Sequence, residues 1–267
     1  MLANITGKRK RLRRILGSDR GTIIVPIDDL LIFGTKEHLA DYDIKIPLLE
    51  NAPVNAVMGF PGVFKQFYKA LCDLPWIMNL TVSTVNHDHT SKKLAFSVEQ
   101  AINVGADAVA VHVNMTSPGE ADMISSLGSV AIDCDKYGMP LMAIVYVRKP
   151  GIGGDDNYEQ LKTENEEEYA SLVAHGCRVA VEMGADIIKT NYTGSPGTFS
   201  KVIKAAGGIP VVVAGGKTVD EFEAISIAEG AIAAGATGVC FGRNTFARKD
   251  IPAFLDRLSC IIDVARK

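Results

Sequence analysis

The sequence predicts an α/β protein that folds as one (β/α)8 TIM barrel, a single domain over residues 1–267. Three observations favour this fold: eight short apolar segments rich in β-branched residues, amphipathic segments between them, and a recurring Gly-Ala-Asp/Thr tripeptide. The 267 residues are enough for one such barrel, which typically takes about 250.

Each apolar segment is typical of a strand buried on both faces, as in a parallel sheet. The predicted strands are 22–27 (TIIVPI), 55–58 (NAVM), 76–80 (WIMNL), 108–113 (AVAVHV), 141–146 (LMAIVY), 187–190 (IIKT), 211–214 (VVVA) and 238–241 (GVCF). Helical spacing of apolar residues predicts helices at 97–103, 122–137, 166–183, 219–233 and 251–265.

The tripeptide closes three helices immediately before a strand, beginning at Gly105, Gly184 and Gly235. Glycine supplies the left-handed turn that ends a helix, so the repeat indicates a recurring helix-to-strand unit. Right-handed crossovers then favour a closed barrel. An open doubly wound sheet is the alternative, weakened because no Gly-x-Gly-x-x-Gly follows the first strand.

Composition excludes several classes of protein. The chain is 47% hydrophobic and 22% charged, which argues against disorder, and a net charge of -3 argues against a dedicated nucleic-acid binder. Five scattered cysteines without a Cys-x-x-Cys pair suggest no disulfide framework or zinc ribbon. With no apolar run near the roughly 18 residues of a membrane span, we expect a soluble cytoplasmic protein.

Two segments lie outside the repeating pattern. We expect residues 1–20 to close the bottom of the barrel with a solvated or subunit-facing helix; its basic run, Lys8 to Arg14, is less consistent with an RNA-binding patch. Residues 149–164 are rich in Gly and acidic side chains and follow the fifth strand. They are predicted to form an irregular loop that acts as a lid.

Active sites of this fold lie at the carboxyl ends of the strands, which draws attention to polar residues there. The most informative is Lys189, inside the apolar strand 187–190. Burial lowers the pKa of an amine and frees it to attack a carbonyl and form a Schiff base. The alternatives are a lysine that reaches solvent at the strand end, or one paired with Asp28 for stability.

Two neighbours are candidates for proton transfer. Tyr146 ends the preceding strand, where its phenol would reach a substrate bound at Lys189, although tyrosine is also common at a barrel rim. Asp28 follows the first strand and would act as an acid or base or orient a hydroxyl. Without the lysine, a loop-capping role for Asp28 would be preferred.

Two glycine-containing loops predict a phosphate site. They follow the last two strands, where barrels commonly bind phosphate through backbone N–H groups. The predicted phosphate ligands are Gly215, Gly216, Lys217, Gly242 and Arg243, with Thr218 as N-cap of the helix behind them. The alternative is that these glycines only turn the chain.

Further polar residues are expected at the substrate mouth: Asp29, His87, His112 and Arg148. The run His87-Asp88-His89 invites a metal interpretation, but barrel metallohydrolases place a His-x-His after the first strand rather than the third. We therefore expect no metal and no other cofactor.

Several of these segments together resemble the archaeal-type, DeoC-like class I fructose-bisphosphate aldolase family over nearly the whole chain. They are residues 7–9, Val25-Pro26-Ile27-Asp28, 112–114, 138–146, Ile188-Lys189-Thr190, Val213-Ala214-Gly215-Gly216 and Phe241-Gly242-Arg243-Asn244. The middle segment is most similar to 2-amino-3,7-dideoxy-D-threo-hept-6-ulosonate synthases and to aldolases of the 3-amino-4-hydroxybenzoate pathway.

The resemblance implies that Lys189 forms the Schiff base, Tyr146 transfers protons, Asp28 is the strand-one carboxylate and the glycine loops hold the substrate phosphate. It also implies a homo-oligomer, often a decamer, acting on phosphorylated small molecules without a metal. Three family motifs differ here: Asp-His-Gly is Asp28-Asp29-Leu30, Tyr-Pro-Arg-Gly is Tyr146-Val147-Arg148-Lys149, and Gly-Gly-Pro-Lys lacks its proline.

These differences touch substrate-facing loops and spare the lysine and the tyrosine. They favour a biosynthetic aldolase that joins a dihydroxyacetone-phosphate-type donor to an aldehyde such as aspartate semialdehyde. Three alternatives stay open: a fructose-bisphosphate aldolase, a coenzyme A dependent thiolase of the same family, and a barrel that binds a phosphorylated metabolite without turnover.

Overall fold

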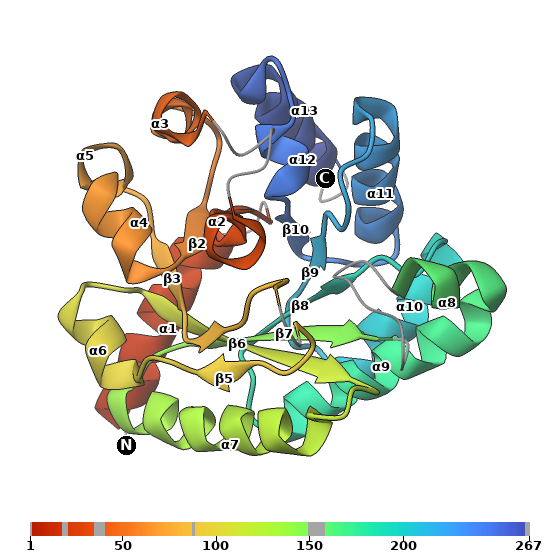
Figure 1. Ribbon diagram of the computed structural model, residues 1–267, viewed down its shortest axis with the longest axis horizontal. Coiled ribbons are helices and arrows are strands. Elements are labelled where there is room, and N and C mark those ends of the chain that lie inside the picture. The colour runs from red at the N-terminus through yellow and green to blue at the C-terminus, as the bar shows by residue number, and fades with distance from the viewer. Residues whose placement is uncertain (1, 18–20, 35–40, 87–88, 149–157, 265–267) are drawn as a thin grey trace.

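The computed structural model describes residues 2–17, 21–34, 41–86, 89–148 and 158–264. Eight parallel strands close into a barrel in the order β1-β10-β9-β8-β7-β6-β3-β2, and helices surround the strands (Figure 1). The predicted (β/α)8 barrel is confirmed, and each of the eight predicted strands is present. A separate two-stranded antiparallel hairpin, β4-β5, follows β3.

The barrel strands are β1 (Thr22–Pro26), β2 (Ala56–Gly59), β3 (Trp76–Asn79), β6 (Ala108–Met115), β7 (Leu141–Val147), β8 (Ile187–Asn191), β9 (Val211–Ala214) and β10 (Gly238–Cys240). The hairpin strands are β4 (Thr81–Val82) and β5 (Lys93–Leu94). The helices are α1 (Leu2–Leu16), α2 (Asp29–Phe33), α3 (Tyr42–Lys45), the 3-10 helix η2 (Ile46–Leu49), α4 (Pro61–Gln66), α5 (Tyr68–Leu71), α6 (Val98–Asn103), α7 (Glu120–Tyr137), α8 (Tyr158–Glu164), α9 (Glu166–Glu182), α10 (Pro196–Ala205), α11 (Glu221–Ala233), α12 (Arg243–Phe246) and α13 (Ile251–Val264).

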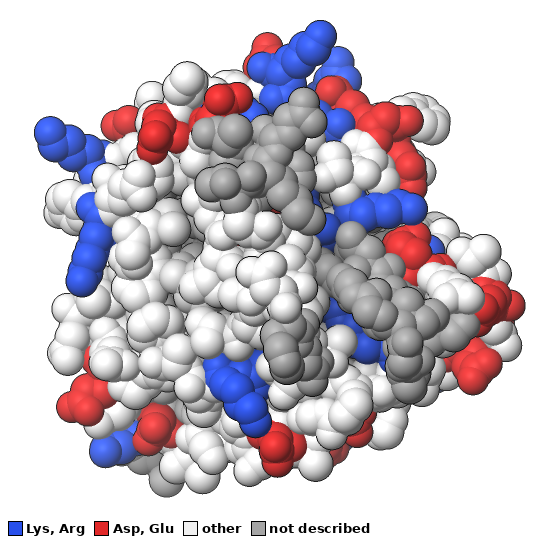
Figure 2. Space-filling model, viewed as in Figure 1, with Lys and Arg blue, Asp and Glu red and all other residues white. Residues whose placement is uncertain are grey.

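Charged side chains of both signs are interspersed around the rim of the face shown in Figure 2, and uncharged residues cover most of its middle. This mixture matches the small net charge of -3. Within the described part of the chain, no helix combines the length and the apolar character needed to span a membrane.

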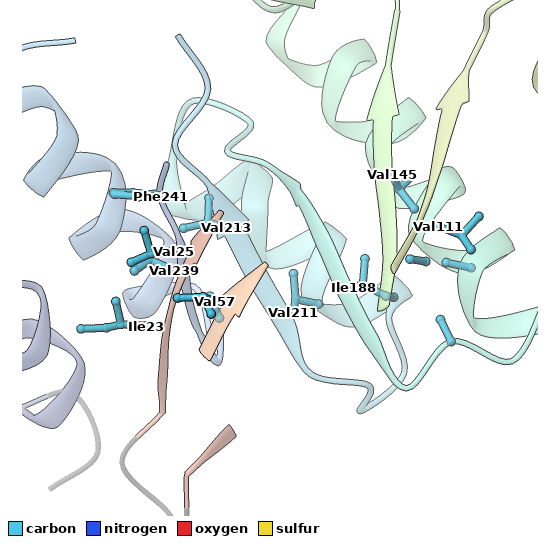
Figure 3. Packing of buried hydrophobic residues seen from close by; sticks show 14 of the residues in the cluster. Ile23, Val25, Val57, Val111, Val145, Ile188, Val211, Val213, Val239 and Phe241 are labelled. Carbon is cyan, nitrogen blue, oxygen red and sulfur yellow. The ribbon is translucent and has the colours of Figure 1, made fainter. Parts of the chain in front are cut away.

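Side chains alternate between the inside of the barrel and the surrounding helices, as the two-residue period of a strand requires. The inner cluster contains residues such as Ile24, Ile77 and Ile144, all at most 2% exposed. The outer cluster packs against the helices, and Figure 3 shows Val25 and Phe241 among its members. Both clusters exclude water, so a polar side chain in the barrel interior needs a specific reason.

The Gly-Ala-Asp repeat has a structural role at the amino ends of the strands. Gly105 and Gly184 have φ angles of 84° and 90°, the left-handed turn expected after α6 and α9. The aspartate that follows then accepts the first N–H of a neighbouring strand: Asp107 from Trp76 (3.1 Å) and Asp186 from Leu141 (2.9 Å).

Helix α1 lies across these same amino ends. Its Ile15 is fully buried and belongs to the inner barrel cluster. Arg14 forms an ion pair with Asp107, and Lys8 lies 3.0 Å from Asp186. Two residues of the basic run therefore bind the repeat aspartates, which accounts for their charge without a nucleic-acid partner.

Two details of the prediction were wrong. Helix α11 begins at Glu221, and its N-cap is Asp220, whose side chain accepts from the Glu223 N–H (2.8 Å); Thr218 precedes the cap. The proposed lid is not irregular throughout, because its end forms helix α8. The remainder of that segment, residues 149–157, lies outside the described residues.

Candidate active site

A cavity opens at the carboxyl ends of the barrel strands, with an empty volume of about 530 Å³ that includes its open mouth. Nine of the twelve predicted site residues line it: Asp28, Asp29, His112, Tyr146, Lys189, Gly215, Gly216, Gly242 and Arg243. The other three are His87, which lies outside the described residues, Arg148 and Lys217.

Lys189 projects into this cavity from the middle of β8. Its strand neighbours in register are Ile144 on β7 and Val212 on β9, both members of the inner cluster. The side chain is only 7% exposed. The alternative of a lysine that reaches bulk water is therefore excluded, and the amine lies where a substrate in the cavity would meet it.

The ionisation of Lys189 differs from the expectation. Burial disfavours the ammonium and by itself lowers the pKa, but nearby groups that carry or can acquire negative charge outweigh burial, so the pKa of Lys189 is raised. In decreasing order of effect these groups are Cys240, Tyr146, Asp28 and Asp29. The expected lowering by burial is therefore outweighed: the sequence offered Asp28 as one possible partner, and the fold adds Cys240, Tyr146 and Asp29 around the amine.

Asp28 is held by a chain of hydrogen bonds from β3. Asn79 donates from Nδ2 to Asp28 Oδ2 at 3.0 Å. The other end of the Asn79 amide, Oδ1, accepts from both the backbone N–H (3.1 Å) and the hydroxyl (3.0 Å) of Thr81. The His112 N–H in turn donates to the Thr81 hydroxyl at 3.0 Å. These bonds fix the carboxylate on the wall of the cavity.

Tyr146 faces the same cavity from β7. The ring of His112 meets it edge-on, with centroids 4.9 Å apart and planes at 83°. The guanidinium of Arg148 lies 5.2 Å from the centre of the Tyr146 ring. Arg148 is only 1% exposed, donates to Asn114 Oδ1 at 2.8 Å and does not line the cavity. Arg148, predicted for the substrate mouth, thus packs against the Tyr146 ring and is not among the residues that line the cavity.

The glycine loops are shaped so that larger residues do not fit. Gly216 has a φ of 66°, in the left-handed region, and a Cβ there would meet the Tyr158 hydroxyl. A Cβ on Gly242 would come within 2.8 Å of the Pro26 carbonyl oxygen. Because these positions have no side chain, their backbone itself lines the cavity on the side of β9 and β10.

Asn244 joins the two loops, and sequence reasoning did not assign it a role in the site. Its side-chain amide donates to the carbonyls of Gly215 (2.8 Å) and Lys217 (2.9 Å), while its Oδ1 accepts from the Val219 N–H (3.0 Å). Asn244 is 1% exposed, so these bonds are shielded from water. The loop after β9 is thereby fixed to the start of α12.

The two cations predicted for phosphate differ in placement. Arg243 lines the cavity, with its guanidinium 5.0 Å from the centre of the Phe33 ring. The Lys217 side chain is about half exposed, lies 3.5 Å from Glu159 on α8 and does not line the cavity. In this structure the side chain of Lys217 is thus directed to α8, whereas Arg243 stands at the cavity.

Among the lining residues that were not predicted, two have ionisable side chains: Cys240 on β10 and Lys92, which comes just before β5. Burial raises the pKa of the Cys240 thiol to about 11, although Lys189 acts to lower it. Among the described residues no group of three or more His, Cys, Asp or Glu side chains is arranged to hold a metal ion.

The sequence matches the model of one protein family, the DeoC/LacD family aldolases, over residues 22–248. This match covers all eight barrel strands and every described residue of the cavity. The chain belongs to the DeoC/LacD aldolase family.

Two relatives of this aldolase are biosynthetic enzymes by name. It is 34% identical to the 2-amino-3,7-dideoxy-D-threo-hept-6-ulosonate synthase of Halobacterium salinarum, over 96% of this chain and 91% of that protein. It is 36% identical to the 2-amino-4,5-dihydroxy-6-oxo-7-(phosphonooxy)heptanoate synthase of Streptomyces griseus, over 94% of this chain and 89% of that protein.

The fold also matches a solved aldolase structure in which a reaction intermediate is bound. An archaeal fructose-1,6-bisphosphate aldolase, with its catalytic Lys covalently bound to the carbinolamine intermediate of the substrate, superposes with a TM-score of 0.82. The two are 26% identical, over 96% of this chain and 99% of that one. The protein described here is an enzyme of this kind, a class I aldolase that forms a Schiff base.

Proposed function

We propose that this aldolase uses Lys189 to join a phosphorylated ketone of the dihydroxyacetone phosphate type to an aldehyde such as aspartate semialdehyde. One observation carries the proposal: a buried lysine shares one cavity with a tyrosine, a carboxylate and two glycine loops. An amine, proton-transfer groups and an anion site are the parts that imine chemistry on a keto phosphate requires.

The choice of substrates rests on the product named for the Streptomyces griseus relative. That heptanoate carries its ketone at C6, its phosphate at C7 and hydroxyls at C4 and C5. An aldol bond forms between the carbon next to the ketone, C5, and the former aldehyde carbon, C4. Dividing the molecule there gives dihydroxyacetone phosphate and 2-amino-4-oxobutanoate, which is aspartate semialdehyde.

In the proposed reaction Lys189 Nζ attacks the ketone carbon, and the carbinolamine loses water to give an iminium ion. The iminium withdraws electrons from the neighbouring carbon, which then loses a proton and becomes the nucleophilic carbon of an enamine. This carbon bonds to the aldehyde carbon, and the aldehyde oxygen takes up a proton. Water finally adds to the iminium, releasing the ketone product and the lysine.

Two side chains are assigned to the proton transfers. Tyr146 and Asp28 both line the cavity that contains Lys189, and both are held in place, by the His112 ring and by Asn79 respectively. We assign Tyr146 to the proton that moves between substrate carbon and oxygen. Asp28 assists at the carbinolamine, where a hydroxyl must leave as water.

The phosphate is assigned to the loops after β9 and β10. Their ligands would be Gly215, Gly216, Gly242 and Arg243, with Lys217 reaching the phosphate only by leaving Glu159. Fixing the phosphate orients the ketone toward Lys189, an effect worth about 7 kcal/mol or more in favourable intramolecular cases. The substrate mouth is completed by Asp29 and His112 from the described residues.

A paired activity screen tests this function. Dihydroxyacetone phosphate is incubated with aspartate semialdehyde, with glyceraldehyde 3-phosphate and with acyl-coenzyme A, and the products are identified by mass spectrometry. A C7 amino keto phosphate is expected from the first pair. Faster fructose 1,6-bisphosphate formation would identify a fructose-bisphosphate aldolase, an acyl transfer would identify a thiolase, and ligand-dependent thermal stabilisation without any product would identify a binding protein.

We also propose that the enzyme is a cytoplasmic homo-oligomer, with ten subunits as the first state to test. Large apolar side chains are exposed on its helices, among them Phe222 (83%), Ile132 (72%) and Tyr68 (68%), which supports association of subunits. The five cysteines are unpaired, which suits a reducing compartment. Native mass spectrometry measures the subunit number, and cell fractionation measures the location.

A further inference from the structure

A second buried lysine faces the cavity. Lys92 is 4% exposed and lines the cavity together with Lys189. It lies at the end of the loop that joins β4 to β5, immediately before Lys93. Buried lysines are uncommon, and this one brings an amine to the edge of the substrate cavity, where an anionic group of a substrate could bind.

The amine of Lys92 is held in a defined position. Its Nζ donates to the Ser83 hydroxyl at 2.7 Å and lies 3.5 Å from His89 Nδ1. The loop that carries these residues is bound to α2 by a hydrogen bond from the Val85 N–H to the Ile32 carbonyl, 3.0 Å long. A group anchored in this way presents its charge to the cavity at a fixed point.

The barrel order places the strand that leads into the Lys92 hairpin across the barrel from the strand that leads into the first phosphate loop. Around the ring β1-β2-β3-β6-β7-β8-β9-β10, strand β3 is four positions from β9 and therefore opposite to it. The hairpin of Lys92 follows β3, and the loop of Gly215 and Gly216 follows β9. A substrate held by its phosphate at β9 and by its ketone carbon at Lys189 on β8 would carry its acceptor end away from the β9 loop, and Lys92 lines the same cavity.

Three cationic side chains line the cavity in the described part of the chain: Lys92, Lys189 and Arg243. Lys189 is assigned to the ketone carbon and Arg243 to the phosphate of the ketone. We propose that Lys92 is the specificity residue for the acceptor, and that its ammonium binds an anionic group, a carboxylate or a phosphate, at the end of the aldehyde remote from the new bond. The proposal rests on the aldolase function proposed above.

Substitution of Lys92 tests this assignment with pairs of aldehydes that differ in charge. Succinate semialdehyde is compared with butanal for a carboxylate, and glyceraldehyde 3-phosphate with glyceraldehyde for a phosphate, each with dihydroxyacetone phosphate as donor. For Lys92→Gln we expect kcat/KM for one anionic acceptor to fall at least tenfold relative to its neutral partner, through a higher KM. The pair that shows the loss identifies the anion.

Three further variants separate recognition from structure. Lys93→Gln removes the same charge from the next residue, whose side chain is largely exposed and lies 3.7 Å from Asp122. This control should leave the kcat/KM ratio of anionic to neutral acceptor unchanged for both pairs. Lys92→Arg keeps the charge and should restore part of the preference. Ser83→Ala removes the hydroxyl that accepts a hydrogen bond from the Lys92 amine. It should lower kcat/KM for the same anionic acceptor, by a smaller factor than Lys92→Gln. Thermal melts establish that each variant is folded.

The outcomes distinguish failure of this proposal from failure of the proposed function. If wild-type enzyme forms a borohydride-trapped adduct with dihydroxyacetone phosphate and Lys92→Gln retains the wild-type ratio for both acceptor pairs, the assignment of Lys92 is wrong and the aldolase function stands. If wild-type enzyme forms no trapped adduct, the proposed function itself is wrong. Equal losses for charged and neutral acceptors would also overturn the assignment, since they would indicate a structural role.

Discussion

The side chain of Asn79 bonds to the carboxylate of Asp28 from two strands away, with Nδ2 and Oδ2 3.0 Å apart. Asn79 ends β3 and Asp28 follows β1, so the bond crosses above β2 at the carboxyl end of the barrel. Thr81 occupies the carbonyl oxygen of the same amide. The side-chain amide of Asn79 therefore cannot flip, and its N–H group points to the Asp28 carboxylate.

Asn79 is predicted to be a positioning residue for Asp28. Replacing it in Asn79→Ala should lower kcat about tenfold or more, since a hydrogen bond to a charged group is worth about 1.5–3 kcal/mol. KM for the ketone should change little, because the phosphate loops are untouched. Asn55→Ala is the matched control: Asn55 accepts from the Ile23 N–H (2.8 Å) at the opposite end of the barrel, so its loss should reduce stability and spare kcat.

The raised pKa of Lys189 predicts a pH dependence of imine formation. Only the free amine attacks a ketone, and below its pKa the amine fraction rises tenfold for each pH unit. The single-turnover rate of cyanoborohydride-trapped adduct formation should therefore increase steadily between pH 7 and pH 9. A rate that is flat across this interval would show that the amine is already neutral, as burial alone would make it.

Arg243 is predicted to bind the phosphate of the ketone. In Arg243→Gln, KM for dihydroxyacetone phosphate should rise about 10- to 100-fold, the cost of losing hydrogen bonds to a charged group. Turnover of unphosphorylated dihydroxyacetone should stay at the wild-type rate. Arg257→Gln removes an exposed arginine that pairs with Glu221 and serves as control. An equal loss for both ketones would place Arg243 outside the phosphate site.

Gly238 is predicted to be essential to the closure of the barrel between β10 and β1. A Cβ there would lie 1.9 Å from the Thr22 carbonyl oxygen, which belongs to the backbone of the paired strand and cannot move aside as a flexible side chain would. Gly238→Ala should lower the free energy of unfolding by at least about 3 kcal/mol, at the severe end for a single substitution. Gly62→Ala, in helix α4 with open space around it, should be neutral or slightly stabilising in the same denaturant titration.

The residues that sequence reasoning found are those that break a strong local pattern. Lys189 and Tyr146 stand out because they are polar ends or interruptions of apolar strands, and the strand order of a closed barrel then brings them to one cavity. The Gly-Ala-Asp repeat was visible for the same reason. The repeat did not reveal that Asp107 and Asp186 also bind helix α1, because these ion pairs join residues that lie far apart in the chain.

The residues that it missed have no such local signal. Lys92 lies at the end of the loop between β4 and β5. These strands have only two residues each, so they show no periodic pattern in the sequence. Asn79 and Asn244 act through hydrogen bonds to residues 51 and 29 positions away. The direction of the Lys189 pKa shift depends on side chains that follow β1 or lie on β7 and β10, as well as on burial, and only the folded barrel brings these groups together.

The covalent bond between substrate and Lys189 is the most direct test of the mechanism. Enzyme is incubated with dihydroxyacetone phosphate, reduced with borohydride and digested, and the peptides are mapped by mass spectrometry. We predict one adduct, on the peptide that contains Lys189, and neither adduct nor turnover in Lys189→Met, whereas Lys201→Met, at an exposed lysine paired with Glu167, should behave as wild type. An adduct on another lysine, or undiminished turnover by Lys189→Met, would contradict the account.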